Sequence, residues 1–579
     1  MVGALALLGL LAPVWGQALP IPDAGSLQRE TGRSLQVPSP APQVVSPAAP
    51  AQTQDPKAPR VTVARFAIEG AELIPEAQLQ GLLADVQGQA LSMAELEQAV
   101  ARIERAYREA GWYARAWLPA QDVTEGLVRI QVLEGRFGEA RLQSAGQGSG
   151  SRANAQAVLQ TITARLQPGQ PLSAADLERG LLLANDLPGI EANAILQAGQ
   201  SVGSSDLAIA VQDTAWVTGD IGLSNHGLRP TGKGQLAGGL ALNDLSGHGD
   251  QLALRMLGAA HLGSVLARYS LPLGHDGLRL AAWGSAMRYS LAGNYSSLEA
   301  KGQAYTAGVG VSYPLLRQQE RNLRLEAGLQ QRRYNDDMLQ TAVRRHRANV
   351  LNLGLGGDWV DSLGGGASNW AGVQLIHGQL SMRDVDADVA LDAAGPRTQG
   401  RYTKLALQWG RVQGLDAWLA PMASSVLGRG WQVQAAASGQ TANKNLGSAE
   451  RMTLGGPDQV RAYPVNEASG DAGLLIKLQL QRQWASGWQA QLFYDWGHIR
   501  QHKNLWVGWD GGTGLANSYH LAGWGLGLGW LGQGSLRGWQ VNASIATPVG
   551  SNPGSAMGRN SDGSSQRSAR GWLSVSRSF

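Results

Sequence analysis

Cysteine is absent from the 579-residue sequence. Disulfide bonds, cysteine-ligated zinc sites and thiol catalysis are therefore excluded. Charge is also sparse, because charged residues make up 16% of the chain and the formal net charge is +4. No segment forms a basic stripe, so nucleic acid is not expected as a partner.

Long apolar segments are missing as well. A membrane-spanning helix needs about 20 consecutive apolar residues, and the marked apolar run at residues 2–15 is shorter than that. This run ends in small residues, so we interpret residues 1–18 as a signal peptide. A secreted chain without spanning helices can still cross a membrane as a closed β-barrel, in which the strands satisfy each other's backbone groups.

Two residue types are unusually frequent. The chain has 77 glycines, and its 19 tryptophans far outnumber its 4 phenylalanines. Tryptophan rings favour the headgroup region of a bilayer. In a chain with a signal peptide, this composition predicts an outer-membrane β-barrel of a Gram-negative bacterium.

The segment that follows the signal peptide has two parts. Residues 19–36 are predicted to contain a short helix, and residues 37–59 hold seven prolines. A segment so rich in proline cannot bury a core and favours an extended linker. We interpret the helix as a mobile element tethered by this linker, and a disordered tail is the alternative.

An internal repeat marks residues 60–212. The segment GQALSMAELE at 88–97 recurs as GQPLSAADLE at 169–178. In each copy a serine stands three residues before an acidic residue, which predicts a capped helix start. The helix of the first copy has an apolar stripe formed by Leu96, Val100, Ile103 and Tyr107. Two tandem α+β modules, 60–136 and 137–212, are the simplest interpretation.

Residues 213–579 show a different sequence pattern. Segments of about ten residues alternate apolar and polar side chains between glycine-rich or polar gaps, which is the pattern of a transmembrane barrel. About sixteen such strands fit, enough to enclose a water-filled lumen. If the chain enters from the periplasm, every second gap faces the outer side, and these gaps include the long ones 289–302, 383–400, 441–472, 500–518 and 547–569, whereas most of the others are short turns. The last residue, Phe579, is an aromatic on the lipid side, as a C-terminal assembly signal would be.

One candidate site joins the longest outer gap to the following strand. Strand alternation directs Phe493, Asp495 and Gly497 into the lumen. An unpaired carboxylate in a pore wall is energetically costly, so a cationic partner is expected. Arg461 can bind Asp495 with two parallel hydrogen bonds if its loop folds inward. Spacing alone leaves an equal alternative, in which Arg461 is a solvated loop charge and Asp495 an ordinary lumen residue.

Together these features resemble the two-partner secretion transporters (the TpsB, haemolysin secretion/activation type), which belong to the POTRA-bearing outer-membrane barrels. Their wall motif Phe-x-Asp-x-Gly is met in full at 493–497. Their inward-loop motif Val-Arg-Gly-Tyr corresponds to Val460, Arg461, Ala462 and Tyr463. Alanine replaces the family's glycine there, which disfavours a positive φ and predicts a slightly rearranged loop tip.

The resemblance implies a function. The two modules would be POTRA domains that bind an unfolded exoprotein through its N-terminal secretion domain, and the barrel would pass that exoprotein to the cell surface. The N-terminal helix would plug the resting pore. Outer-membrane lipids, and the barrel-assembly machinery during biogenesis, are the other implied partners. No cofactor, metal or enzymatic activity is expected.

Three other functions are alternatives. A barrel-assembly insertase of the same superfamily is the main alternative, but such proteins usually carry more POTRA modules and no linker-tethered helix. A passive porin needs no large periplasmic part. A membrane enzyme, such as a phospholipase barrel, would need histidine and serine side by side, whereas the nine histidines are scattered without metal-ligand spacing.

Overall fold

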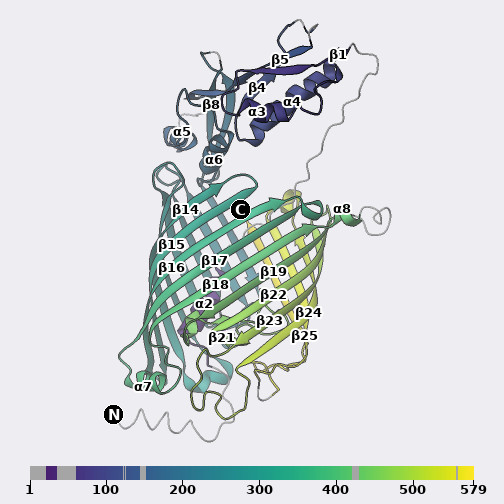
Figure 1. Cartoon of the computed structure of the whole chain (residues 1–579). Helices are drawn as coiled ribbons and strands as arrows, with labels where there is room; N and C mark the ends of the chain where they lie inside the picture. Colours follow the sequence, from purple (N-terminus) through teal and green to yellow (C-terminus); the bar gives the residue numbers. More distant parts are fainter. Residues whose placement is uncertain are drawn as a thin grey trace.

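The computed structural model of the protein describes residues 21–35, 60–121, 123, 126–143, 152–201, 203–419, 429–555 and 558–579. The expected signal peptide 1–18 and linker 37–59 lie outside these ranges. Figure 1 shows a tall barrel, two small α+β modules above one rim, and helix α2 inside the barrel. None of the described helices is long and apolar enough to cross a membrane.

The barrel consists of sixteen antiparallel strands in a closed sheet, as the sequence predicts. Its first eight strands are β9 (Val217–Ser224), β10 (Gln235–Asn243), β11 (Gln251–Ala259), β12 (Leu262–Pro272), β13 (Arg279–Ser290), β14 (Lys301–Arg317), β15 (Arg321–Met338) and β16 (Thr341–Asp361). The others are β17 (Ala367–Met382), β18 (Gly400–Gly414), β19 (Trp431–Ala442), β22 (Ala472–Gln483), β23 (Trp488–Arg500), β24 (Ser518–Leu531), β25 (Trp539–Val549) and β26 (Arg570–Ser578). Strand β26 pairs with β9 through five residue pairs and closes the wall.

Side chains along each strand alternate between the bilayer and the lumen because the strand period is two residues. On β24, Trp524, Leu526 and Leu528 are exposed on the outer face, and glycines fill the lumen face between them. On β23, Leu492 and Tyr494 are exposed, whereas Phe493 and Asp495 are buried inside. The wall therefore presents an apolar band to lipid.

The connections at the two rims differ in length. The rim away from the α+β modules carries the long connections 291–300, 383–399, 443–471, 501–517 and 550–569. They contain η1 (Gly293–Leu298), α7 (Asp386–Ala394) and η3 (Ser448–Glu450). At the opposite rim most connections are short turns, two of them with η2 (Leu363–Gly365) and η4 (Gly534–Leu536); the one after β18 is longer and begins with α8 (Asp416–Leu419). This asymmetry places the modules in the periplasm and the long loops outside the cell.

The first module has a three-stranded sheet in the order β2-β5-β4. Its elements are β1 (Arg60–Thr62), β2 (Arg65–Glu69), α3 (Glu76–Gly81), β3 (Ala90–Ser92), α4 (Met93–Glu109), β4 (Ala114–Trp117) and β5 (Leu127–Glu134). Ser92 and Glu95 cap α4 reciprocally, and the stripe Leu96, Val100, Ile103 and Tyr107 is buried. The Tyr107 hydroxyl donates a 2.7 Å hydrogen bond to Glu134. Burial, reinforced by this bond, raises the pKa of Tyr107.

The second module repeats the topology of the first. It consists of β6 (Arg136–Leu142), α5 (Ala155–Ile162), α6 (Ala174–Asn185), β7 (Ile190–Ala198) and β8 (Ser204–Asp213). In both modules the last strand is central, with a parallel partner on one side and an antiparallel partner on the other. Ser173 caps α6 by accepting from the Asp176 amide. The internal repeat of the sequence is therefore a structural repeat.

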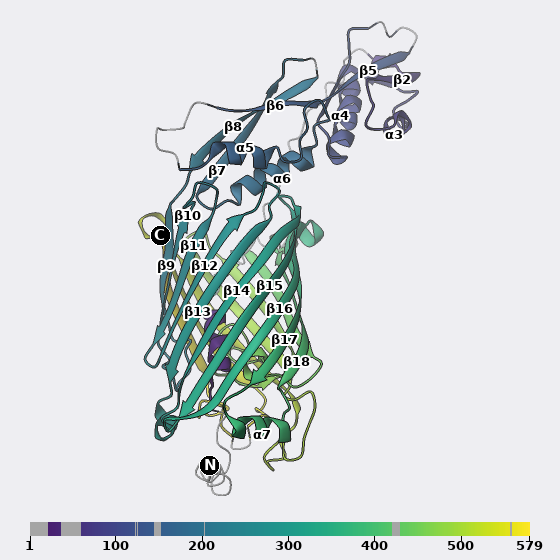
Figure 2. The same cartoon turned by 90° about the vertical axis from the view of Figure 1, so that its left-hand side faces the viewer.

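The two modules are joined by backbone pairing. Trp112 forms an antiparallel bridge with Ser173, and the Tyr113 amide donates to the Leu172 carbonyl at 3.3 Å. These bonds link the start of β4 to the segment before α6, so the modules form a continuous periplasmic arm (Figure 2).

Candidate functional site

The loop between β19 and β22 folds back into the barrel. After η3, two strands of two residues each, β20 (Met452–Thr453) and β21 (Ser469–Gly470), pair in an antiparallel manner. Its apolar side chains pack with the wall in one buried cluster that includes Leu454, Val460, Ala462, Tyr463, Phe493 and Leu521. We call residues 443–471 the inward loop. The prediction from sequence placed it at 441–472, two residues earlier at its start and one later at its end.

Arg461 of the inward loop and Asp495 of β23 form a bidentate ion pair. The Arg461 Nε donates to Asp495 Oδ2 at 2.8 Å, and Nη2 donates to Oδ1 at 2.8 Å. The Arg461 backbone amide adds a third bond of 3.1 Å to Oδ2. Arg461 is 6% exposed and Asp495 is fully buried. Because each charge is paired and the carboxylate accepts three donors, the cost of burying them is offset.

Other contacts fix the guanidinium in place. Its central carbon lies 3.3 Å from the centroid of the Phe493 ring, a cation–π contact. Its Nη1 donates to Gln479 at 3.3 Å. The indole nitrogen of Trp572, on β26, donates to the Arg461 carbonyl oxygen at 2.8 Å. The arginine is thus held by strands β22, β23 and β26.

Two glycines in the wall make room for the loop. A Cβ at Gly497 would lie 2.6 Å from Cδ2 of Leu454, a fully buried side chain. At Gly523 of β24, a Cβ would overlap the methyl group of Ala462. The φ of Ala462 is not positive, so the alanine in place of the family's glycine causes no backbone strain. Tyr463, the last residue of the motif, is fully buried in the same cluster.

Acidic residues anchor both ends of the inward loop, and sequence reasoning missed them. Near the start, Glu450 binds Arg332 at 2.5 Å and Lys404 at 2.7 Å. Near the end, the buried Glu467 accepts from Asn552 at 2.6 Å and from the backbone amide of Ser561 at 2.8 Å. No motif or short spacing links these partners, which come together through the folding of the outer loops against the barrel wall and against one another.

Helix α2 (Ala24–Ser34) lies in the lumen, where Figure 2 shows it in purple. Asp23 caps its first turn by accepting from the Ser26 amide at 2.8 Å. The same carboxylate binds Arg344 of β16 at 3.0 Å, and the Ala24 amide donates to Asp336 of β15 at 2.9 Å. The N-terminal end of the helix is therefore fastened to the barrel wall.

The rest of α2 is held largely by the inward loop. Arg29 donates to the carbonyl oxygens of Ser448 and, at 2.9 Å, Arg451. Arg33 donates to Thr453 at 2.9 Å. Leu27 is fully buried in the cluster that fills this part of the barrel. The helix thus lies between the inward loop and strands β13–β16, and it reduces the free cross-section of the lumen.

The turn between β12 and β13 is one of the places where the second module contacts the barrel. Asp276 in this turn binds Arg165 at 2.9 Å and Arg179 at 3.0 Å, and Tyr313 donates to it at 2.6 Å. Partial burial opposes ionisation, but these hydrogen bonds outweigh it and lower the pKa of Asp276 to about 2. The module is therefore tied to the periplasmic rim.

Within the described ranges, no group of three or more histidine, aspartate or glutamate side chains is placed to hold a metal ion. The arrangement instead defines a wide polar pore, an internal helix, a loop locked to the wall, and a periplasmic arm. A protein with these parts is an outer-membrane transporter with N-terminal domains in the periplasm.

Comparisons with known proteins identify the family. The family model described as haemolysin secretion/activation protein ShlB/FhaC/HecB matches residues 203–530, and that of the POTRA domain, ShlB-type, matches residues 61–135. The chain belongs to the haemolysin secretion/activation family and is a two-partner secretion transporter, as its sequence motifs predict. Members of this family are transport channels.

Similar proteins cover most of the chain. The heme/hemopexin transporter protein HuxB of Haemophilus influenzae (strain 86-028NP) is 26% identical over 92% of this chain and 93% of its own. The outer membrane transporter CdiB of Dickeya dadantii (strain 3937) is 23% identical over 78% of this chain and 77% of its own. The structure of CdiB from Escherichia coli shares the fold, with a TM-score of 0.65, 19% identity, and coverage of 92% of this chain and 93% of that one.

Proposed function

We propose that the modules 60–136 and 137–212 are both POTRA domains and that they bind an unfolded exoprotein through its N-terminal secretion domain. The second module shares the strand pairing of the first, which supports the assignment. The exoprotein would then pass through the barrel and fold at the cell surface. Folding outside the cell supplies the driving force, since no P-loop is present in the sequence.

The exposed strand β7 is a candidate surface for this binding. It is an edge strand of its sheet, paired with β8. Ile195 is 57% exposed and Leu196 is 38% exposed on it. An extended client segment can add to such an edge through main-chain hydrogen bonds, with apolar side chains adding contact area.

The observation that carries the proposal of transport through the barrel is the helix inside its lumen. Helix α2 lies in the lumen and is held mainly by hydrogen bonds and ion pairs, which can exchange with water or with a client. We propose that α2, within residues 19–36, is a plug, and that the motif residues Val460, Arg461, Ala462, Tyr463, Phe493, Asp495 and Gly497 fix the inward loop against which it rests. Transport then requires α2 to leave its site.

Two further roles follow from the outer surface. The Phe579 ring is 64% exposed at the end of β26, and we propose that it serves as the assembly signal read by the barrel-assembly machinery. The apolar band of the wall contacts outer-membrane lipids. We propose that this chain acts as a transport channel and not as an enzyme.

Deleting residues 60–212 tests the binding role. We expect the remaining chain to form a heat-modifiable barrel that conducts ions in planar bilayers, while secretion of the partner exoprotein is lost. Secretion at the normal level by the deleted chain would overturn the proposal. A chain that no longer inserts would call for the smaller change Ile195→Asp with Leu196→Asp, which leaves the module in place and should lower secretion.

A further inference from the structure

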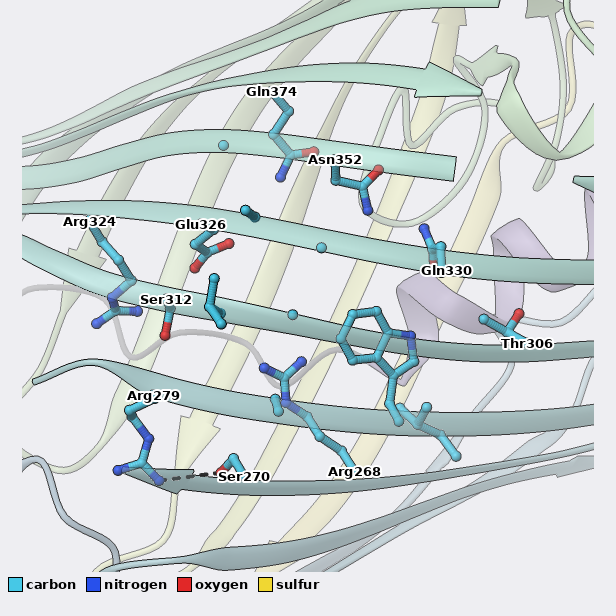
Figure 3. Close-up of a pocket in the computed structure, with 18 of the residues that line it drawn as sticks. Arg268, Ser270, Arg279, Thr306, Ser312, Arg324, Glu326, Gln330, Asn352 and Gln374 are labelled. Atoms are coloured by element: carbon cyan, nitrogen blue, oxygen red, sulfur yellow. Dashed lines mark hydrogen bonds between the residues drawn. The ribbon is translucent and has the colours of Figure 1, made fainter. Parts of the chain in front are cut away.

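A cavity of about 1030 Å³ occupies the periplasmic part of the lumen. At one end it is lined by Leu183 and Asp186, from helix α6 and its C-terminal end in the second module, and at the other by Gln28 and Arg33 of α2. It therefore lies on the path between the periplasmic arm and the plug helix. Figure 3 shows the wall of this cavity, with α2 in purple beside Thr306.

Three arginines project into this cavity: Arg268 from β12, Arg279 from β13 and Arg324 from β15 (Figure 3). None of the three forms an ion pair with a carboxylate of the described chain. The central guanidinium carbon of Arg268 lies 5.6 Å from the centroid of the Trp283 ring. Arg279 donates to the Gly249 carbonyl at 3.1 Å and to Ser270 at 3.3 Å. Arg268 and Arg324 are exposed to the water of the lumen.

The acidic side chains of this cavity do not cancel the arginines. Asp186 is bound by Arg317 at 2.8 Å, and Glu450 is bound by Arg332 and Lys404. Glu326 is the remaining carboxylate lining the cavity among the described residues. Positive charge is therefore in excess on this wall, and it is surrounded by low-dielectric material that strengthens its field.

Strand register spaces these charges along the pore. Arg279, Ser312 and Glu326 form one cross-strand row. Arg324 lies two residues from Glu326 on the same face of β15, nearer the start of that strand. Arg268 pairs with Trp283, which pairs with Gly308, and the Trp283 ring fills the space above Gly308 and Gly310. The wall thus offers separated cationic groups with a flat aromatic ring between them.

We propose that this arginine wall is a binding site for carboxylate side chains of the polypeptide in transit. A guanidinium binds a carboxylate with paired hydrogen bonds, and several weak, spaced sites let a charged chain advance from one to the next, as ions do in a channel. An acidic client segment released from the second module meets these arginines before it reaches α2. The proposal rests on the proposed function only in naming the exoprotein as the source of the carboxylates.

The test uses the full-length chain in planar bilayers with peptide probes. Deca-glutamate, deca-glutamine and deca-lysine are added in turn on the periplasmic side during open events. We expect deca-glutamate to block the current at concentrations at least tenfold lower than the other two, with block weakening as salt is raised. In the variant Arg268→Gln, Arg279→Gln, Arg324→Gln, block by deca-glutamate should be lost, and the reversal potential in a KCl gradient should shift toward cation selectivity.

A matched variant controls for the loss of three charges. Arg288, Arg333 and Arg347 lie on strands β13, β15 and β16, toward the rim with the long loops, and are exposed on the outer face, so Arg288→Gln, Arg333→Gln, Arg347→Gln should leave both block and selectivity unchanged. Equal block by deca-glutamate and deca-glutamine, or equal block in the two triple variants, would overturn the proposal. The block and selectivity measurements do not depend on secretion. A failure of this proposal can therefore be told apart from a failure of the proposed secretion function.

Discussion

The indole of Trp572 donates its hydrogen bond to the carbonyl oxygen of Arg461. Trp572 belongs to β26, the strand that closes the barrel against β9, so the inward loop is attached to the closing strand as well as to β23. The side chain of Arg461 binds β22 and β23, and its backbone binds β23 and β26. Moving the loop therefore requires the loss of contacts on both sides of it.

Replacing Arg461 should separate assembly from transport. In Arg461→Ala the buried Asp495 loses its cation, and breaking a buried pair in this way typically costs about 3–5 kcal/mol. We expect a barrel that remains heat-modifiable in the membrane but secretes no partner. Arg461→Lys should also fail, because lysine cannot form the paired bonds. Arg333→Ala, on the outer face, is the control, and normal secretion by Arg461→Ala would remove the role proposed for the motif.

The contact between Ala462 and Gly523 predicts a compensating pair. Gly523→Ala forces two methyl groups into the same space, and overpacking of this kind costs about 1–3 kcal/mol. Ala462→Gly removes one methyl group and should be nearly neutral. The double variant Ala462→Gly, Gly523→Ala should recover most of the stability lost in Gly523→Ala. Unfolding in urea, followed by heat-modifiability on gels, measures all three, and additive effects would contradict the contact.

Weakening the hold on α2 should open the pore. Arg29→Ala with Arg33→Ala removes the bonds that this helix makes to the Ser448 and Arg451 carbonyls and to Thr453. We expect the open probability in planar bilayers to rise severalfold, and deletion of residues 17–36 to raise conductance further. Arg288→Ala is the control for a lost arginine. Unchanged conductance in the deletion would argue against a plug.

Acid should loosen the second module from the rim. The pKa of Asp276 lies at about 2 in the folded protein against an ordinary value of 3.8. The stabilisation from its ionised form is therefore complete above about pH 4 and is lost as the pH falls toward 2. Because the chain has no cysteine, spin labels at Gln197→Cys and Leu363→Cys can report the distance between module and barrel.

The expected result is a distance distribution that broadens between pH 4 and pH 2. In Asp276→Asn the neutral amide should give the broad distribution already at neutral pH. A narrow distribution in that variant would show that Asp276 does not hold the module. A pH dependence of equal size in the variant would assign the effect to other carboxyl groups.

The barrel could be predicted from sequence because its determinants are local. Two-residue alternation and polar gaps placed β23 at 487–499, against Trp488–Arg500 in the structure. The pairing of Arg461 with Asp495, which spacing alone left as one of two equal interpretations, needed only the parity of β23 and the family motif to be considered. By contrast, the bonds from Asp23 to Arg344 and from Glu450 to Arg332 join residues far apart in the chain, and they depend on the register and curvature of the whole wall. No local pattern encodes such contacts.

The short pairing between β9 and β26 bears on how the protein is made. The two strands meet through five residue pairs, from Ser224 with Ser574 to Asp220 with Ser578, whereas β15 and β16 share eighteen. The wall cannot be sealed until the final residues of the chain arrive, because the partner of the first strand is the last one. Losing even a few C-terminal residues would leave two strand edges facing hydrocarbon with unmet backbone groups, so a truncated product should be discarded during insertion instead of persisting as a leaky pore.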